Sequence, residues 1–351
     1  MSVRKVAVRA AMLGIAAVLV LALASCGSKD LVSLAKLDKG EITIKDRFGN
    51  SVKVPDPASL LTAIKGAKPA NDSTAQQVAN PEQASYILSA GAGDLYYDWD
   101  NNYLFYVSGN KKTVYSLDLK AFLLGIPGLP PRIAVGPGND PKISGSFPEL
   151  AKVPLPSAAL FKSGDKGLLL VAAGEQPTGG YSMELEKVSV KDGSLSITVR
   201  LRSPSGTPPA GVSYPYLELS IAKYMPVEVS VVRATSTGDR TDRANTATVP
   251  QDGNVVLYKP DRGSLLTERV RVYGFARIPS DSSLRIHVED GHYVLGAYNV
   301  SIAKPAPSWS YFDFNMDLAQ ATNPSGMVIA TRATSGKTVT ELEVPVAFGG
   351  K

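Results

Sequence analysis

The chain has 351 residues, with 37 Lys and Arg against 32 Asp and Glu, one cysteine and two histidines. Hydrophobic residues make up 44% of the chain, which is enough to bury a core and excludes a chain that is disordered by composition. The single cysteine excludes a disulfide scaffold, an iron–sulfur cluster and a cysteine-rich zinc site. The 31 glycines and 25 prolines indicate many turns, and the length favours two or three domains. We therefore expect a mainly β, multi-domain protein.

Residues 1–25 have the pattern of an export signal. Arg4, Lys5 and Arg9 precede an uncharged apolar run over residues 10–24. This run is shorter than the ~20 apolar residues that a membrane-spanning helix needs. Loss of the signal removes three basic charges, which leaves 34 − 32 = +2. No cluster of Lys or Arg follows, so nucleic acid is not expected as a partner.

The signal ends in Leu23, Ala24 and Ser25, directly before Cys26, the only cysteine of the chain. This pattern resembles the bacterial lipobox, in which the chain is cut before the cysteine and a diacylglycerol is attached to it. The resemblance implies a lipid anchor on Cys26 that holds the protein at the extracytoplasmic face of the bacterial cell membrane. An ordinary secretory signal with an incidental cysteine is the alternative. Residues 26–40 would then be a tether.

The first block, residues 41–126, predicts a small α+β domain. Alternating polar and apolar residues on either side of 47–50 indicate a β-hairpin. Apolar residues at helical spacing predict a helix over 58–67. A second hairpin is expected around residues 100–102.

Aromatic residues crowd this second hairpin, with Tyr97, Trp99 and Tyr103 among them. Exposed, they would form a platform for stacking sugar rings, and the protein would bind peptidoglycan or another cell-wall polymer through the first block. Alternation along a strand sends about half of such residues inward, so they could equally form the core of the domain. Both interpretations stay open at this stage.

The remaining chain predicts two β-rich blocks joined by a linker. Residues 127–158 are rich in proline and glycine and predict a semi-stiff linker. Residues 159–233 contain several strand-like runs and a hairpin signal at Asp192-Gly193. Residues 234–251 are polar and Thr-rich, which indicates a second linker. Residues 252–348 contain seven short strand-like runs and predict an immunoglobulin-like β-sandwich, with Trp309, Phe312 and Phe314 in its core.

The block 159–233 resembles the C-terminal domain of the protease-complex subunit PrcB family. Four short segments carry the resemblance. They are residues 174–182 (GEQPTGGYS), the hairpin turn Asp192-Gly193, Ser203-Pro204 and Tyr214-Pro215-Tyr216. It implies a small β-rich accessory domain without catalytic residues. The glycines of residues 174–180 indicate a β-turn, since the Lys-Ser/Thr of a phosphate-binding loop is missing.

The block 252–348 resembles the immunoglobulin-like domain of bacterial spore-germination proteins. The residues that carry this resemblance are Lys259-Pro260, Gly263-Ser264, the strand 272–276 (VYGFA) and Trp309-x-x-Phe312-Asp313-Phe314. The resemblance implies a domain that lies at the end of an envelope lipoprotein beside another small module.

The two histidines lie five residues apart in the third block. If Asp290-Gly291 makes a two-residue hairpin turn, Glu289 pairs with His292 and His287 with Val294. Paired and alternate residues share a face of a sheet, so His287, Glu289 and His292 could hold a metal ion. A polar, solvated hairpin face is the alternative.

We find no arrangement of residues that predicts catalysis. No Ser lies in a Gly-x-Ser-x-Gly turn, and the chain has only two histidines that could act as the base for a nucleophile. We therefore expect a non-enzymatic envelope protein without a cofactor that binds a protein partner, in a protease-complex or germination-like assembly, through exposed strand edges. Binding of a cell-wall polymer by the first block is the alternative function, and a carboxylate-only hydrolase is a third.

Overall fold

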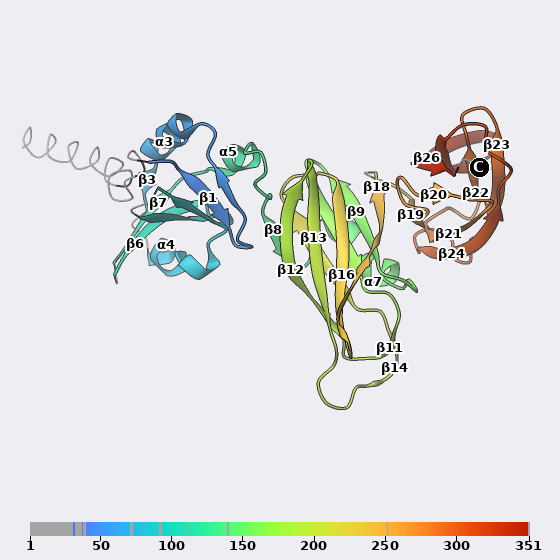
Figure 1. The fold of residues 1–351 in the computed structure, drawn as a ribbon, viewed down its shortest axis with the longest axis horizontal. Coiled ribbons are helices and arrows are strands. Elements are labelled where there is room, and N and C mark those ends of the chain that lie inside the picture. The colour runs from blue at the N-terminus through green and yellow to red at the C-terminus, as the bar shows by residue number, and fades with distance from the viewer. Residues whose placement is uncertain are drawn as a thin grey trace, which may run out of the picture. The chain divides into compact units, whose positions relative to one another are not determined.

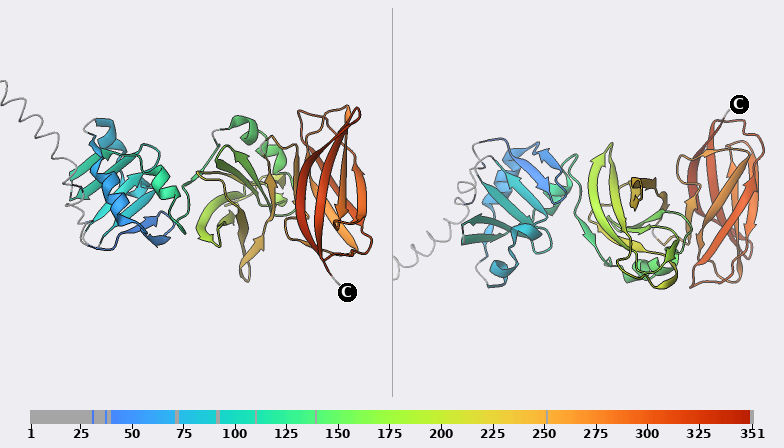
Figure 2. Two further views of the ribbon diagram at one scale, coloured as in Figure 1. Left: turned by 90° about the horizontal axis from the view of Figure 1, so that it is seen from above. Right: turned by 60° about the horizontal axis from the view of Figure 1, so that its bottom comes forward.

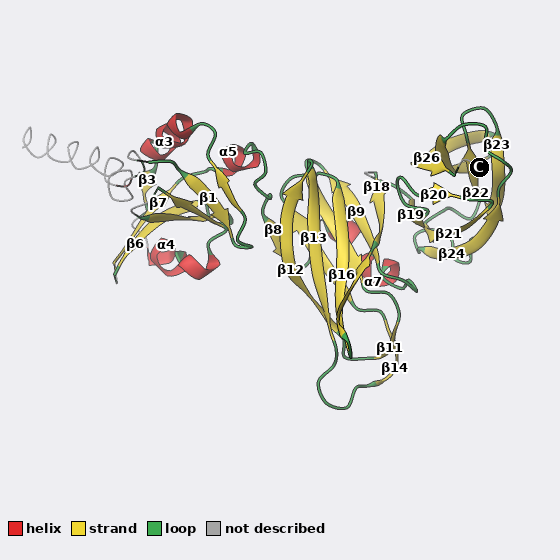
Figure 3. Ribbon diagram, in the orientation of Figure 1, coloured by secondary structure: helices red, strands yellow, loops and turns green. Residues whose placement is uncertain are grey.

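The structure is a computed structural model that describes residues 31, 37, 40–70, 73–90, 93–109, 111–138, 140–250 and 252–349. The export signal, the lipobox residues 23–25, Cys26 and most of the tether lie outside the described residues. The chain divides into two compact units, Met1–Pro131 and Arg132–Lys351. Strands dominate both units (Figure 3), which confirms the prediction of a mainly β, multi-domain protein. Among the described residues, no helix is long and apolar enough to cross a membrane.

Unit 1 is built on one antiparallel sheet in the order β2-β1-β4-β5-β6-β7-β3. Its strands are β1 (Thr43–Asp46), β2 (Ser51–Lys53), β3 (Lys68–Pro69), β4 (Tyr86–Ser89), β5 (Asp94–Asp98), β6 (Tyr103–Ser108) and β7 (Lys111–Ser116). Its helices are α3 (Pro57–Lys65), α4 (Ser73–Val78) and α5 (Lys120–Leu124), with a 3-10 turn η1 (Pro81–Gln83). The helices and the sheet make the α+β domain that the sequence predicts (Figure 1).

Short-range hydrogen bonds fix both predicted hairpins of unit 1. The Asp46 carboxylate accepts hydrogen bonds from the backbone N–H groups of Phe48 and Asn50, at 2.9 and 2.8 Å. Gly49 has φ of +87°, which a residue with a side chain rarely adopts. In the second hairpin, Asp98 accepts backbone N–H bonds from the turn that joins β5 to β6. Asx turns of this kind explain why both turns could be predicted from sequence.

Unit 2 contains a middle domain and a C-terminal domain. The middle domain has an inner sheet in the order β18-β9-β10-β15-β8 and an outer sheet in the order β12-β13-β16-β17. Its strands are β8 (Ile133–Val135), β9 (Ser157–Ser163), β10 (Lys166–Ala172), β11 (Gln176–Thr178), β12 (Ser182–Lys191), β13 (Ser194–Arg202), β14 (Ala210–Ser213), β15 (Tyr216–Ile221), β16 (Val227–Thr235), β17 (Gly238–Arg243) and β18 (Asn245–Val249), with short helices α6 (Pro141–Ser144) and α7 (Phe147–Leu150).

The turn between β12 and β13 confirms the predicted hairpin. Lys191 pairs with Ser194, and Asp192 and Gly193 between them have φ of +51° and +76°. Positive φ at both central residues is the conformation that Asp-Gly favours in a two-residue turn.

Both segments that the sequence predicts as linkers carry secondary structure that belongs to the middle domain. Residues 127–158 contain β8, α6 and α7, and Asp140 caps α6 with Pro141 at its first position. Residues 234–251 contain β17 and β18, and β18 pairs in parallel with β9. The prediction of linkers was therefore wrong. The first segment is rich in proline because prolines begin its helices, and the second is polar because many of its strand residues face solvent.

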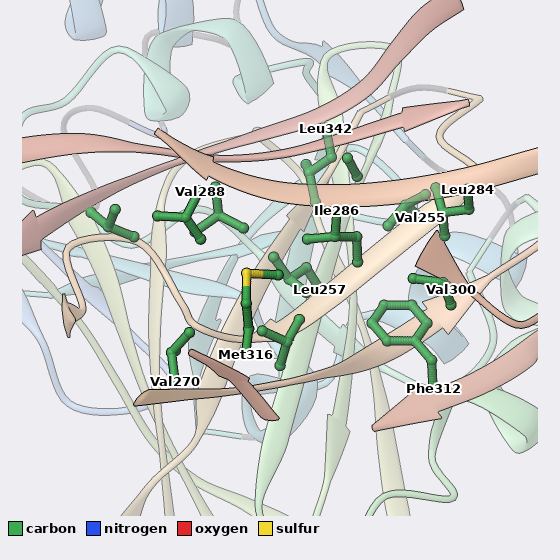
Figure 4. Packing of buried hydrophobic residues seen from close by; sticks show 14 of the residues in the cluster. Val255, Leu257, Val270, Leu284, Ile286, Val288, Val300, Phe312, Met316 and Leu342 are labelled. Carbon is green, nitrogen blue, oxygen red and sulfur yellow. The ribbon is translucent and has the colours of Figure 1, made fainter. Parts of the chain in front are cut away.

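The C-terminal domain is a sandwich of two sheets (Figure 2). One sheet has the order β19-β21-β24 and the other β20-β26-β25-β22-β23. The strands are β19 (Val255–Lys259), β20 (Leu265–Leu266), β21 (Arg269–Ala276), β22 (Ser282–Glu289), β23 (Val294–Val300), β24 (Ser310–Asp317), β25 (Ser325–Thr334) and β26 (Lys337–Phe348). Apolar side chains from both sheets, including Val255, Ile286, Phe312 and Met316, interdigitate between them (Figure 4). The predicted sandwich architecture is present.

A second apolar cluster joins the two domains of unit 2. It combines Phe161, Leu168 and Leu170 of the inner sheet with residues of the sheet β19-β21-β24, such as Tyr258 and Phe275. Alternate residues of β19 and β21 thus pack into the sandwich on one side and against the middle domain on the other. The two domains of unit 2 therefore share an apolar interface.

Candidate partner-binding surface

Two of the three aromatic residues proposed for polymer binding lie in the core of unit 1. Tyr97 is fully buried and Trp99 is 9% exposed. The Tyr97 hydroxyl accepts a hydrogen bond from the Leu119 N–H at 3.1 Å and donates one to Asn102 at 3.2 Å, and burial raises its pKa to about 12. The Trp99 ring packs edge-on against Tyr97. These two rings hold the end of α5 to the sheet and leave no open face for a sugar ring.

Tyr103 lies on the opposite face of the sheet from Tyr97. Tyr97 pairs with Leu104, the residue after Tyr103, and paired residues share a face whereas consecutive residues do not. Tyr103 is half-buried and packs against a cluster that contains Phe105, Val114 and Ala75 of α4. The structure therefore does not bring Tyr103 together with the other two residues. All three serve the packing of unit 1.

The histidine hairpin differs from its prediction, and the two-residue turn is wrong. Glu289 pairs with Val294 after a bulge, so the turn spans residues 290–293. The buried Asp290 carboxylate stabilises this longer turn, since it accepts hydrogen bonds from the backbone N–H groups of His292 and Tyr293 at 3.0 and 2.8 Å. The alternation of polar and apolar residues along the strands does not show that the Asp290 side chain accepts hydrogen bonds from its own turn, so the sequence pattern did not predict the turn length.

The longer turn separates the three proposed metal ligands. The His287 Nε2 and Glu289 Oε2 atoms are 4.0 Å apart, whereas the His292 Nδ1 lies 2.9 Å from the Asn323 amide. Within the described parts of the chain, no three His, Cys, Asp or Glu residues are grouped so that they could hold a metal ion. The hairpin instead holds the loop around Thr322, whose N–H and hydroxyl both donate to Asp290 at 2.7 Å.

A two-stranded ribbon projects from the middle domain and is not part of its apolar core. We call residues 175–181 and 203–215 the arm. It consists of β11 and β14, which pair antiparallel, and of the loops that join them to the outer sheet. The arm lies beyond the ends of β12, β13 and β16 (Figure 1). No described residue from 203 to 215 is buried.

Hydrogen bonds hold the two sides of the arm together. The Gly179 N–H donates to the Pro209 carbonyl at 2.9 Å, and the Ser213 hydroxyl donates to the Thr178 carbonyl at 2.5 Å. At the base, the Tyr214 hydroxyl donates to the Glu175 carboxylate at 2.8 Å, which raises the pKa of Tyr214. The arm is thus an ordered structure and not a loose loop.

Two glycines of the arm motif stand where a side chain would not fit. Gly174, at the base of the arm, has φ of +80°, and a Cβ there would lie 2.8 Å from the Leu155 carbonyl carbon. Gly180 has φ of +81°, and a Cβ there would lie 2.9 Å from the Pro204 side chain. The buried Gln176 side chain donates to the carbonyls of Ala173 and Gly174 and fixes the same bend. The β-turn predicted over 174–180 is therefore wrong, because residues 176–178 form strand β11 and the two glycines lie on either side of it.

The surface of the arm and its base is partly apolar. Val212 on β14 is 56% exposed, Leu155 beside Gly174 is 40% exposed and Tyr216 at the start of β15 is 38% exposed. Sequence reasoning did not single out Val212 or Leu155. The only sequence signal was the run of prolines and glycines around them, which marks a rigid exposed segment without showing which side chains it presents.

A family model described as PrcB C-terminal matches residues 168–222. The match runs from β10 to the end of β15 and contains the arm. This confirms the resemblance of the middle domain to that family. The family suggests an accessory module of a protease complex.

Comparisons with whole proteins add little. No curated protein matches the chain. A crystal structure of an engineered protein is 18% identical, with a TM-score of 0.21, and the match covers 30% of this chain and 21% of that chain. The crystal structure of dimeric latent PorU from Porphyromonas gingivalis is 9% identical, with a TM-score of 0.23, and the match covers 88% of this chain and 29% of that chain. The chain thus spans less than a third of either protein, and nothing about its own fold follows from such low scores.

Proposed function

We propose that the chain is a non-enzymatic, lipid-anchored protein of the bacterial cell envelope that acts as the accessory module of a protease complex. In this proposal a diacylglycerol on Cys26 holds the chain at the extracytoplasmic face of the membrane, and the arm binds a protein partner. The C-terminal sandwich, which resembles germination-type immunoglobulin-like domains, packs against the middle domain and forms part of the same accessory module. A germination-like assembly in place of a protease complex is the second setting that the sequence supports.

The observation that supports this proposal is the arm itself. It lies inside the segment that matches the PrcB C-terminal family. Its hydrogen bonds and glycines fix its conformation, so a partner would not have to order it on binding. Its exposed Val212, and Leu155 and Tyr216 at its base, offer apolar contacts that the fold does not use. The described structure offers no comparable reason to assign polymer binding to unit 1.

Site-specific crosslinking tests the proposal. A photoreactive amino acid at position 212 in the full chain, expressed in its own host, should form a crosslink to a protease or protease subunit that mass spectrometry identifies. Val294 on β23 is the matched control, because it is 53% exposed against 56% for Val212. Equal products from both positions, or none from position 212, would contradict the role of the arm.

Lipid anchoring has its own test. Metabolic labelling with an alkyne fatty acid should label the chain and should fail to label the Cys26→Ser variant, which should also leave the membrane fraction. Labelling of that variant to the same extent would contradict the anchor.

A further inference from the structure

Two leucines of the predicted tether belong to the folded part of unit 1. Leu31 and Leu37 lie within residues 26–40, and the structure describes both. Leu31 is fully buried and Leu37 is 1% exposed, so the two rank with Ile42 and Leu60 among the most deeply buried side chains of the unit. A loose tether would leave apolar side chains in water. The chain is therefore already held to unit 1 at Leu31.

The chain is fixed again shortly after these leucines. Gly40 lies beside the end of β4, where a Cβ on it would be 3.5 Å from the Ala90 carbonyl oxygen. The Ile42 carbonyl then accepts a hydrogen bond from the Val54 N–H at 2.9 Å. The earliest described point at which the chain is fixed to unit 1 is thus Leu31, well before the sheet begins.

This early attachment leaves a short connection to Cys26, the residue proposed to carry the diacylglycerol. Only residues 27–30 separate Cys26 from Leu31. A chain spans at most about 3.6 Å per residue, so the five steps from Cys26 to Leu31 cover at most about 18 Å. If unit 1 began at Gly40 instead, the fourteen steps from Cys26 would cover about 50 Å. The buried leucines thus shorten the reach of the anchor nearly threefold.

Unit 1 is wide compared with this reach. A domain of about 100 residues has a radius of gyration of about 13 Å, which corresponds to a diameter of about 34 Å for a sphere. Leu31 is fully buried, so part of the connection must cover the way out of the interior. The remaining length is less than about half the diameter of the domain. Such a connection cannot hold unit 1 away from a membrane that contains the acyl chains.

We propose that unit 1 rests on the lipid headgroups of the membrane, and that burial of Leu31 and Leu37 holds it there. The partner of this surface is the bilayer itself, and the surface lies around the point where the chain leaves Leu31. The inference rests on acylation of Cys26 in the proposed function. It deepens that function, because the fold of unit 1 and not only the lipid then sets the distance from the membrane.

Energy transfer between unit 1 and the bilayer tests this inference. The acylated full chain is reconstituted into phosphatidylcholine vesicles in which some headgroups carry an acceptor dye. Lys65→Cys, at an exposed position of α3, carries the donor dye, because acylation blocks the thiol of Cys26. We expect strong transfer in this chain. A Gly/Ser insertion of about 20 residues directly after Gly27 adds up to about 70 Å of reach and should lower the transfer at least about twofold.

A substitution of both leucines tests their role separately. Leu31→Asn with Leu37→Asn should release the tether and lower the transfer as the insertion does. Leu265→Asn is the matched control, because Leu265 is 66% exposed and lies in unit 2, and it should leave the transfer unchanged. Circular dichroism checks the folding of each variant, and the insertion leaves both leucines in place if the double substitution disturbs unit 1.

The outcomes separate this inference from the anchor itself. Equal transfer in the parent chain and the insertion variant would overturn the inference, and so would full transfer in a folded chain that lacks both leucines. Either result in a chain that takes up the alkyne fatty acid would leave lipid anchoring intact. A chain that takes up no fatty acid would refute the anchor, and the inference would fall with it.

Discussion

The Asn245 side-chain amide donates a hydrogen bond to the Tyr273 hydroxyl at 2.8 Å, and this bond joins β18 of the middle domain to β21 of the C-terminal domain. Tyr273 is fully buried, and its hydroxyl also lies 3.4 Å from the Ser157 hydroxyl. The contact sits at the edge of the apolar cluster that the two domains share. The domains therefore meet through polar as well as apolar contacts.

Removing this hydroxyl should weaken the whole of unit 2. Tyr273→Phe leaves the Asn245 amide with only its longer hydrogen bond to the Pro156 carbonyl, at 3.4 Å, so we expect the free energy of unfolding to fall by about 1–2 kcal/mol. Tyr298→Phe is the control, because Tyr298 is 43% exposed and its ring stacks on Phe314. Urea denaturation of the full chain measures both changes, and equal losses would contradict the role of the bond.

The shared apolar cluster predicts that both domains of unit 2 unfold together. Phe275→Ala removes a side chain that is 2% exposed and packs in that cluster, so we expect a loss of about 3–5 kcal/mol. Hydrogen exchange should speed up in β10 of the middle domain as well as in β21, where the substitution lies. Faster exchange confined to the C-terminal domain would show that the two domains are independent.

The base of the arm predicts a difference between two glycines with the same backbone conformation. Gly174 and Gly206 have φ of +80° and +79°, but a Cβ at Gly174 would meet Leu155 at 2.8 Å, whereas a Cβ at Gly206 would meet nothing within 4 Å. Gly206→Ala should cost about 1–2 kcal/mol from backbone strain alone. Gly174→Ala should cost about 2–5 kcal/mol, because a steric clash adds to the strain. Thermal denaturation checks the order, and a larger loss from Gly206→Ala would be inconsistent with this packing.

Asp290 predicts a pH dependence of stability. Hydrogen bonds from the Thr322 hydroxyl, and then from backbone N–H groups, hold the pKa of the folded-state carboxyl below its ordinary value of 3.8. A depressed pKa stabilises the folded chain above that ordinary value, and the stabilisation is lost as the pH falls toward the folded-state pKa. The gap in unfolding free energy between the natural chain and Asp290→Asn should therefore be largest near pH 7 and shrink below about pH 4.

The control for this pH dependence is Asp165→Asn, at an exposed turn between β9 and β10. Its unfolding free energy at pH 7 should differ little from that of the natural chain. A gap for Asp290→Asn that does not change with pH would show that the carboxylate stabilises the loop through its shape and not through its charge.

Local signals made much of the fold predictable. Asp192-Gly193 carries its own turn preference, and the apolar run that includes Leu168–Leu170 marks a strand that is buried on both faces. Leu168 and Leu170 pack toward the C-terminal domain, while Leu169 between them is also fully buried. Such a strand loses the usual alternation, and its continuous apolar run is itself the signal.

The errors arose where long-range contacts decide the outcome. Ala247 and Val249 of β18 are buried in the apolar cluster that the two domains share, and the polar residues that alternate with them made the segment look like a linker. The prediction that Trp309 lies in the core of the sandwich was wrong. Trp309 is buried in the apolar cluster that the middle domain and the C-terminal domain share. The arm was visible as a motif, yet its exposed Val212 depends on a pairing of β11 with β14 that the sequence does not specify.

The pairing of the strands also limits how the middle domain can be cut into fragments. The segment that matches the family model, residues 168–222, includes β13, β15 and most of β10 but leaves out their partners β16, β8 and β9. A recombinant fragment trimmed to those boundaries would expose three unpaired strand edges and apolar side chains that are buried in the whole unit, and it would be expected to aggregate. The smallest piece suitable for expression is therefore the whole stretch from residue 132 to the C-terminal sandwich.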